Sequence, residues 1–330
     1  MSELVDVKME SERKDNPQTP QNRKLSVKNS FGKNIPFYLI LLPAVITVFM
    51  VQYLPMFGLL IAFKDYNVRA GIFGSPWAEM GGFANFVQIF QTPAFLDSVW
   101  NTLWLNVLSL LFSFPAPIIL ALLINEVGHT GFKRTVQTIS YLPHFLSIAA
   151  VTTMVNQLLG NYGLVNAVLK FFGAESVYLL EQESAFVPTY VITEVWQTVG
   201  WGTIVYLAAI TGINPDLYEA ADIDGASAWR KIWAVTIPGM MPVIGIQLIL
   251  NAGNLIKDDF DQIYSLVGGS NYELRSVTEV FSSLVFRNLQ GGPKGFSAST
   301  AISLVQSVMS LGLVLTADAI VRKTDNPGLW

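Results

Sequence analysis

Two rows of polar and aromatic residues lie in segments that are otherwise apolar, and each row has the spacing of one helix face. Amides and carboxylates bind sugar hydroxyls, and an indole can pack on a pyranose ring, so the rows are a candidate substrate path. The alternative is that the amides hold neighbouring helices together. The rows are Glu194, Gln197 and Trp201, and Gln247, Asn251, Asn254 and Asp258.

Acidic residues and histidines offer other chemistry. Asp258, Asp259 and Asp261 carry ligands that hard cations prefer, but they lack the glycine and the spacing of a calcium loop, which favours a solvated acidic rim. His129 and His144 are expected to have packing or interface roles rather than metal or proton work. No metal site is predicted, and the chain has no cysteine.

The elements that carry these residues are predicted to be membrane helices. The chain of 330 residues is 52% hydrophobic and only 13% charged, so much of its surface is expected to face lipid. The net charge of −4 gives no sign of a nucleic-acid partner. Six uncharged or nearly uncharged stretches are long enough to span a bilayer as helices, an all-α membrane fold. They are residues 36–63, 98–125, a stretch within 138–160, 188–212, 232–256 and 295–317.

The distribution of basic residues predicts the orientation. With the amino-terminal segment inside, thirteen of the twenty Lys and Arg fall on the cytoplasmic side and seven outside, which places both termini in the cytoplasm. Residues 1–35 are polar with mixed charge and predict a flexible cytoplasmic tail rather than a signal peptide. Residues 36–323 form the predicted six-helix domain, and 324–330 a short tail.

The cytoplasmic loop 213–231 is predicted to contain a helix of its own. Asn214 suits the N-cap, Pro215 the first helical position and Gly225 a left-handed C-terminal cap. Glu219 would offer a charged anchor on this helix, and the small Ala220 and Ala221 would allow a partner to approach closely. The loop therefore predicts a docking surface.

This loop resembles the signature of the inner-membrane permeases of ATP-binding-cassette (ABC) importers, which is Glu-Ala-Ala, three residues, Gly, nine residues, then Ile-x-Leu-Pro. The chain has Glu219-Ala220-Ala221, then Gly225, then Val235-Thr236-Ile237-Pro238, with two apolar replacements. The wider phrase from Asn214 to Ala226 is similar to carbohydrate-uptake members, especially the oligosaccharide and polysaccharide permeases.

The resemblance implies a type I ABC importer permease fold and a coupling helix that docks in a cleft of the ATPase. Glu219 would be the anchor, Ala220 and Ala221 the close-approach surface, and Gly225 the turn. The family motif also assigns Asp224, Ile237 and Pro238 to the coupling segment. Nucleotide-driven closure of the ATPase would pass through this segment to the pore.

The partners implied are a second permease, expected to be a different chain, two ATPases, an extracytoplasmic solute-binding protein and a carbohydrate. The acidic rim is expected to contact the binding protein. The chain would be a multi-pass protein of the bacterial inner membrane and not an enzyme, since it has no phosphate-binding loop; ATP and magnesium would belong to the ATPases. The alternative is an ion-gradient-driven secondary transporter of a small polar solute, which would need ionisable residues at mid-membrane. Glu194 is nearly the only ionisable residue within the predicted spans, and it lies close to the outer end of its span.

Overall fold

The computed structural model describes residues 34–267 and 273–323, so most of the predicted amino-terminal tail and all of residues 324–330 lie outside the described part. Within the described residues every regular element is helical, apart from one isolated β-bridge between Lys64 and Trp77. Contacts divide the chain into two units, Met1–Phe57 and Gly58–Trp330.

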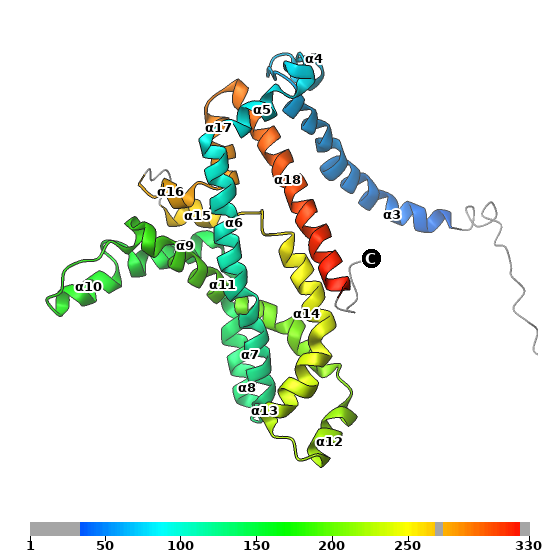
Figure 1. The fold of residues 1–330 in the computed structure, drawn as a ribbon, viewed down its shortest axis with the longest axis vertical. Coiled ribbons are helices and arrows are strands. Elements are labelled where there is room, and N and C mark those ends of the chain that lie inside the picture. Colours follow the sequence, from blue (N-terminus) through cyan, green and yellow to red (C-terminus); the bar gives the residue numbers. More distant parts are fainter. Residues whose placement is uncertain (1–33, 268–272, 324–330) are drawn as a thin grey trace, which may run out of the picture. The chain divides into compact units, whose positions relative to one another are not determined.

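The first predicted span and the helices that follow it occupy the amino-terminal half (Figure 1). The elements are α3 (Ile35–Val48), η1 (Phe49–Tyr53), η2 (Leu54–Phe63), α4 (Gly71–Gly74), η3 (Met80–Gly82), α5 (Ala84–Phe90), α6 (Pro93–Ser113), α7 (Pro115–Glu126), α8 (Thr130–Tyr141), η4 (Leu142–Phe145), α9 (Ile148–Leu159) and α10 (Leu164–Phe171).

The carboxyl-terminal half contains two long helices and the loop helix. Its elements are η5 (Leu179–Glu181), α11 (Glu183–Thr211), α12 (Pro215–Ile223), α13 (Ala228–Lys231), η6 (Ile232–Thr236), α14 (Ile237–Ala252), α15 (Phe260–Leu266), α16 (Arg275–Thr278), α17 (Phe281–Gln290) and α18 (Pro293–Arg322).

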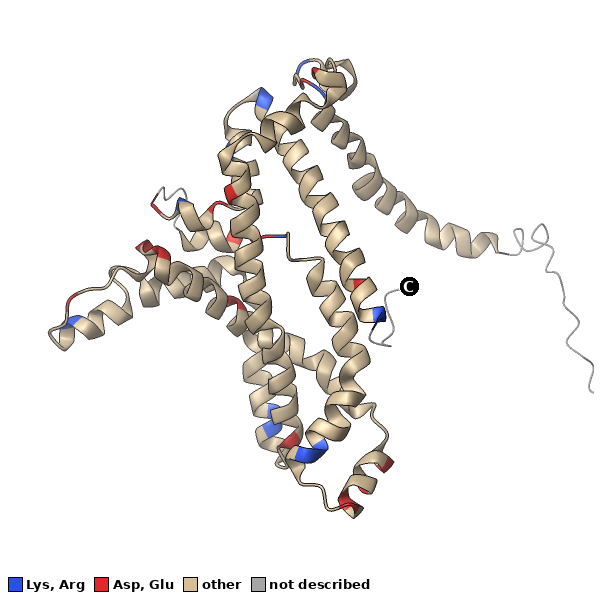
Figure 2. Cartoon of the chain, in the orientation of Figure 1, with Lys and Arg blue, Asp and Glu red and all other residues tan. Residues whose placement is uncertain are grey.

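Four helices of the described part are long and apolar enough to cross a membrane: Ile35–Phe63, Pro93–Glu126, Ala228–Ala252 and Lys294–Arg322. They correspond to the first, second, fifth and sixth predicted spans. The fourth predicted span is a continuous helix, α11, of 29 residues, longer than the roughly 20 needed to cross a bilayer. Figure 2 shows long uncharged stretches in α6, α14 and α18, with charged residues at helix ends and in connections.

The third predicted span is not one straight helix. Thr130–Phe145 and Ile148–Phe171 pass the same test together, but they are bent by 102°. Pro143 cannot donate a backbone hydrogen bond, and Ser147 caps a new helix by accepting from the Ala150 N–H at 3.2 Å. The chain therefore ends one helix and starts another inside the stretch 138–160.

Two other helical segments continue past a proline through a wider, π-helical turn. The five-residue turns η1 and η6 are π-helical, and each lies just before a proline, Pro55 or Pro238. Proline removes a donor and clashes with the carbonyl four residues earlier, so a wider turn lets the helix continue past it.

Three apolar clusters hold the second unit together. One joins α5, α6, α17 and α18 around Phe95 and Phe281, another joins α6, α11 and α15 around Phe186 and Ile263, and the third joins α7, α11 and α14 around Met240. Because α11 takes part in two clusters, it positions the loop at its end, which contains α12.

Candidate functional site

The loop helix α12 has the ends that the sequence predicts. The side chain of Asn214 caps it by accepting from the Asp216 N–H at 3.1 Å, and Pro215 is its first residue. At its end Gly225 has a φ of +71°. The Gly225 N–H donates to the Asp222 carbonyl at 3.1 Å, and the Ala226 N–H donates to the Ala221 carbonyl at 2.9 Å. This pair of bonds is a Schellman cap, which needs a left-handed residue at the position of Gly225.

One face of α12 is tied to the start of the next long helix. Tyr218 and Thr236 share a hydrogen bond between their hydroxyls at 3.0 Å, and Lys231 forms an ion pair with Asp222 at 2.8 Å. The ion pair is partly exposed and contributes little by itself. Together the two contacts connect α12 to η6 and α13, the short turns that lead directly into α14.

The opposite face of α12 is open. Glu219 and Ala220 are exposed, and Ala221 is half-buried. Ile223, one turn after Glu219, is 87% exposed, and Leu217 is 53% exposed. These two apolar residues were not among those predicted from the sequence, although an isoleucine on the Glu219 face of a polar loop helix was a usable signal.

The other predicted coupling residues continue this segment. Asp224 is exposed and is the C-cap of α12, Ile237 begins α14, and Pro238 is in its first turn. Pro238 follows the π-helical turn η6, so the predicted motif ends where the helix is locally widened.

The first polar row is on α11 and is partly used for packing. The Gln197 amide donates to the Leu146 carbonyl at 3.2 Å, at the break between η4 and α9. Trp201 stacks on His144 with ring centroids 4.6 Å apart. One carboxylate oxygen of Glu194 is buried and has no hydrogen-bond partner within the described part of the chain. Gln197 thus stabilises the helix break, and the packing role predicted for His144 is confirmed.

The second polar row is shorter than the sequence indicates. Gln247 and Asn251 are half-buried on α14, and the Asn251 amide donates to the Gln247 carbonyl at 2.8 Å. The helix ends at Ala252, so the prediction that Asn254 and Asp258 continue the same face is wrong. Gly253 begins a series of turns there, and the Ser310 hydroxyl of α18 donates to its carbonyl.

The prediction of a solvated acidic rim is also wrong for two of its three members. Asp258 accepts from the Ser282 N–H at 2.9 Å and from the Gln306 amide at 3.3 Å. Asp259 caps α15 by accepting from the Gln262 N–H at 3.1 Å. Both carboxylates are half-buried; Asp258 connects α17 and α18, Asp259 caps α15, and Asp261 is exposed.

The long apolar helices, the broken third segment and the capped loop helix define a membrane transport permease. A family model described as the inner membrane component of binding-protein-dependent transport systems matches residues 113–325. The chain belongs to this family of ABC permeases, so the resemblance of its loop is confirmed.

Individual relatives agree with this assignment. The chain is 40% identical over 295 residues to the polygalacturonan/rhamnogalacturonan transport system permease protein YteP of Bacillus subtilis, covering 89% of each chain. It is 37% identical to a chain in the crystal structure of a bacterial alginate ABC transporter in complex with an alginate pentasaccharide-bound periplasmic protein, with a TM-score of 0.81 and coverage of 92% of this chain and 99% of that chain.

A second transporter structure has the same fold. It is a bacterial ABC transporter involved in the import of the acidic polysaccharide alginate, with 38% identity, a TM-score of 0.80 and coverage of 90% and 98%. The predicted type I ABC permease fold is therefore confirmed for this chain.

Proposed function

We propose that this chain is the pore-forming permease subunit of an ABC importer that carries a sugar, an oligosaccharide or a polysaccharide fragment across the bacterial plasma membrane. An extracytoplasmic binding protein would deliver the substrate. The proposal rests chiefly on α12, whose capped helix presents Glu219 and Ile223 on an open face and is tied to α14 by its other face. The names of the relatives support the carbohydrate substrate.

The contacts of α12 support a coupling role. An ATPase that moves α12 would also move the start of α14, because Tyr218 and Asp222 hold the turns η6 and α13 that lead into it. Glu219 would anchor the ATPase, and Ala220 would allow its close approach. Two ATPases bind ATP and magnesium in this proposal, and the permease itself catalyses no reaction. A second, different permease would complete the pore.

The proposed topology has six crossings with both termini in the cytoplasm, a tail at 1–35, a domain at 36–323 and a short tail at 324–330. In this arrangement the bent pair of helices and α11 supply the third and fourth crossings. Glu194, Trp201, Gln247 and Asn251 are the proposed path residues, because none of their side chains is fully buried in this chain alone. Gln197 and Asn254 have weaker support, since one binds a backbone carbonyl and the other follows the end of α14.

The charge reversal Glu219→Lys tests the proposal. It is made in the complete complex and assayed for co-purification of the ATPase and ATP-dependent uptake of oligosaccharides. We expect uptake to fall at least tenfold, because one buried anchor at an interface is worth about 2 kcal/mol or more. Glu175→Lys is the control, since it reverses an exposed charge on the side predicted to be external.

Two results would contradict the proposal. One is a Glu219→Lys complex that retains its ATPase and full uptake. The other is wild-type uptake that follows an ion gradient and ignores ATP, which would favour the secondary-transporter alternative.

A further inference from the structure

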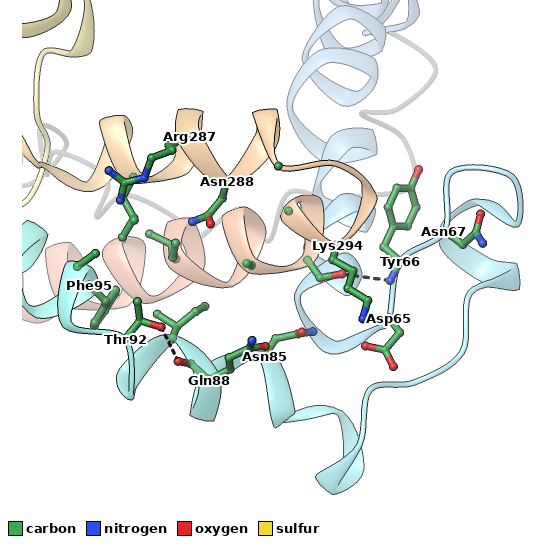
Figure 3. Close-up of a pocket in the computed structure, with 18 of the residues that line it drawn as sticks. Asp65, Tyr66, Asn67, Asn85, Gln88, Thr92, Phe95, Arg287, Asn288 and Lys294 are labelled. Atoms are coloured by element: carbon green, nitrogen blue, oxygen red, sulfur yellow. Dashed lines mark hydrogen bonds between the residues drawn. The ribbon is translucent and has the colours of Figure 1, made fainter. Parts of the chain in front are cut away.

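A pocket with an apolar base and a charged rim lies at the opposite end of the second unit from α12, among segments predicted to be external (Figure 1). It has a volume of about 1100 Å³ and is bounded by the loop after η2, by α5, by α17 and by the start of α18 (Figure 3). Ile89, Phe95, Leu284 and Ile302 line it, and all four belong to the apolar cluster that joins these helices. The pocket therefore has a packed apolar base.

The rim of the pocket is positively charged. Arg69, Arg287 and Lys294 line it, against a single carboxylate, Asp65, among the described lining residues. Arg287 already forms an ion pair with Glu279. Arg69 and Lys294 form no ion pair with any residue that the structure describes, so their charges are available to a ligand.

Two amides in the pocket are available as well. The side chains of Gln88 and Asn288 have no hydrogen-bond partner within the described ranges. Asn85 differs, because its amide donates to the Ala62 carbonyl at 2.9 Å and to the Lys64 carbonyl at 3.2 Å and so fixes the wall. The pocket thus combines cations and amides that have no partner among the described residues with a wall that Asn85 holds in place.

We propose that this pocket binds the carboxylate groups of an acidic saccharide before the saccharide enters the pore. Cations recognise carboxylates, with arginine able to do so through two hydrogen bonds, and amides recognise sugar hydroxyls. The volume of about 1100 Å³ is slightly above the usual range for small-molecule pockets, about 300–1,000 Å³, and suits more than one sugar ring. This inference rests on the proposed importer function and specifies the charge of its substrate.

The test measures uptake by the complete complex in proteoliposomes with its binding protein. The probe is an alginate trisaccharide, compared with the same trisaccharide whose carboxylates are methyl esters. The variant is the double substitution Arg69→Gln and Lys294→Gln. Lys170→Gln is the control, because it removes an exposed cation from α10, which does not line the pocket.

We expect the double variant to raise the KM for the acidic trisaccharide about three- to tenfold, as the loss of two partly exposed charge contacts should do. The turnover rate and the uptake of the ester should stay the same. Added salt should raise the KM of the wild type more than that of the variant.

An unchanged KM overturns the inference, and so does the same rise with Lys170→Gln. A variant that loses uptake of the ester equally would show that the pocket binds the binding protein or maintains the fold, and this also overturns it. If the wild type takes up only the neutral ester, the inference fails and the importer function stands. If the wild type takes up neither form of the trisaccharide with ATP, this inference fails, whereas the proposed function is tested separately by Glu219→Lys with other oligosaccharides.

Discussion

At the scale of single residues, Asp259 caps a helix with a carboxylate whose pKa is raised by burial. Its carboxylate caps α15, yet it lies half-buried near Asp258 and Asp261. Burial raises the pKa of Asp259 above its ordinary value, the two neighbouring carboxylates raise it further, and the hydrogen bond from the Gln262 N–H opposes them. The folded protein therefore holds this proton more tightly than the unfolded chain does.

This predicts a loss of stability as the pH rises. A raised pKa in the folded state stabilises the protein fully below the ordinary aspartate value of about 3.9, and the contribution is lost as the pH rises through the raised value. Asn also caps helices well, so Asp259→Asn should keep α15 and flatten the dependence of the melting temperature on pH in this acidic range. Melting of the purified complex over that range would show it, and a slope equal to that of the wild type would refute it.

At the scale of helices, α11 is placed by a close approach between backbones. A Cβ at Gly200 would lie 1.9 Å from the carbonyl oxygen of Ser140 on α8, and the backbone on either side cannot yield as a flexible side chain would. Glycine at this position therefore allows α11 to cross α8.

Gly200→Ala should lower the free energy of unfolding by about 1–3 kcal/mol or more, because overpacking forces the two backbones apart. The matched control is Gly312→Ala in α18, where a Cβ would meet nothing within 4 Å. Alanine there should be neutral or stabilising by up to about 1 kcal/mol, since it favours the helix. Thermal melting of the two complexes tests this, and equal melting temperatures would rule out the close approach.

Elements whose ends are set by residues close in sequence could be predicted from the sequence. Asn214, Pro215 and Gly225 set the limits of α12 by themselves, so the loop helix was predicted correctly. The end of α14 and the break after Phe145 depend on distant partners instead. Ser310 binds the Gly253 carbonyl, and Gln197 binds the Leu146 carbonyl across 51 residues of sequence. A helical periodicity carries no information about such contacts, which is why the row from Gln247 to Asp258 was extended too far.

At the scale of the whole molecule, the chain exposes large apolar side chains along several long helices, an arrangement that is unfavourable in water. No residue of α3 is buried, and many large apolar side chains on α6 and α18 are exposed, including Trp100, Trp104 and Leu311. Patches of this size are typical of contact with lipid or with other subunits. The number of membrane crossings depends on the bent pair of helices Thr130–Phe145 and Ile148–Phe171. This pair either spans the membrane or returns to the side where it began.

Cysteine labelling should distinguish these two topologies, because the chain has no native cysteine and each single substitution gives a unique thiol. With six crossings, a thiol at Ala174 reacts with an impermeant maleimide added outside spheroplasts, whereas thiols at Ser2, Ala228 and Lys323 react only after lysis. If the pair from Thr130 to Phe171 were re-entrant, Ala174 would be protected and Ala228 accessible. The expected result is labelling at Ala174 alone, because the bent pair together has the apolar length of one span. Labelling at Ala228 from outside would place α12 on the external side, where no ATPase could dock, so this one position also tests the coupling proposal.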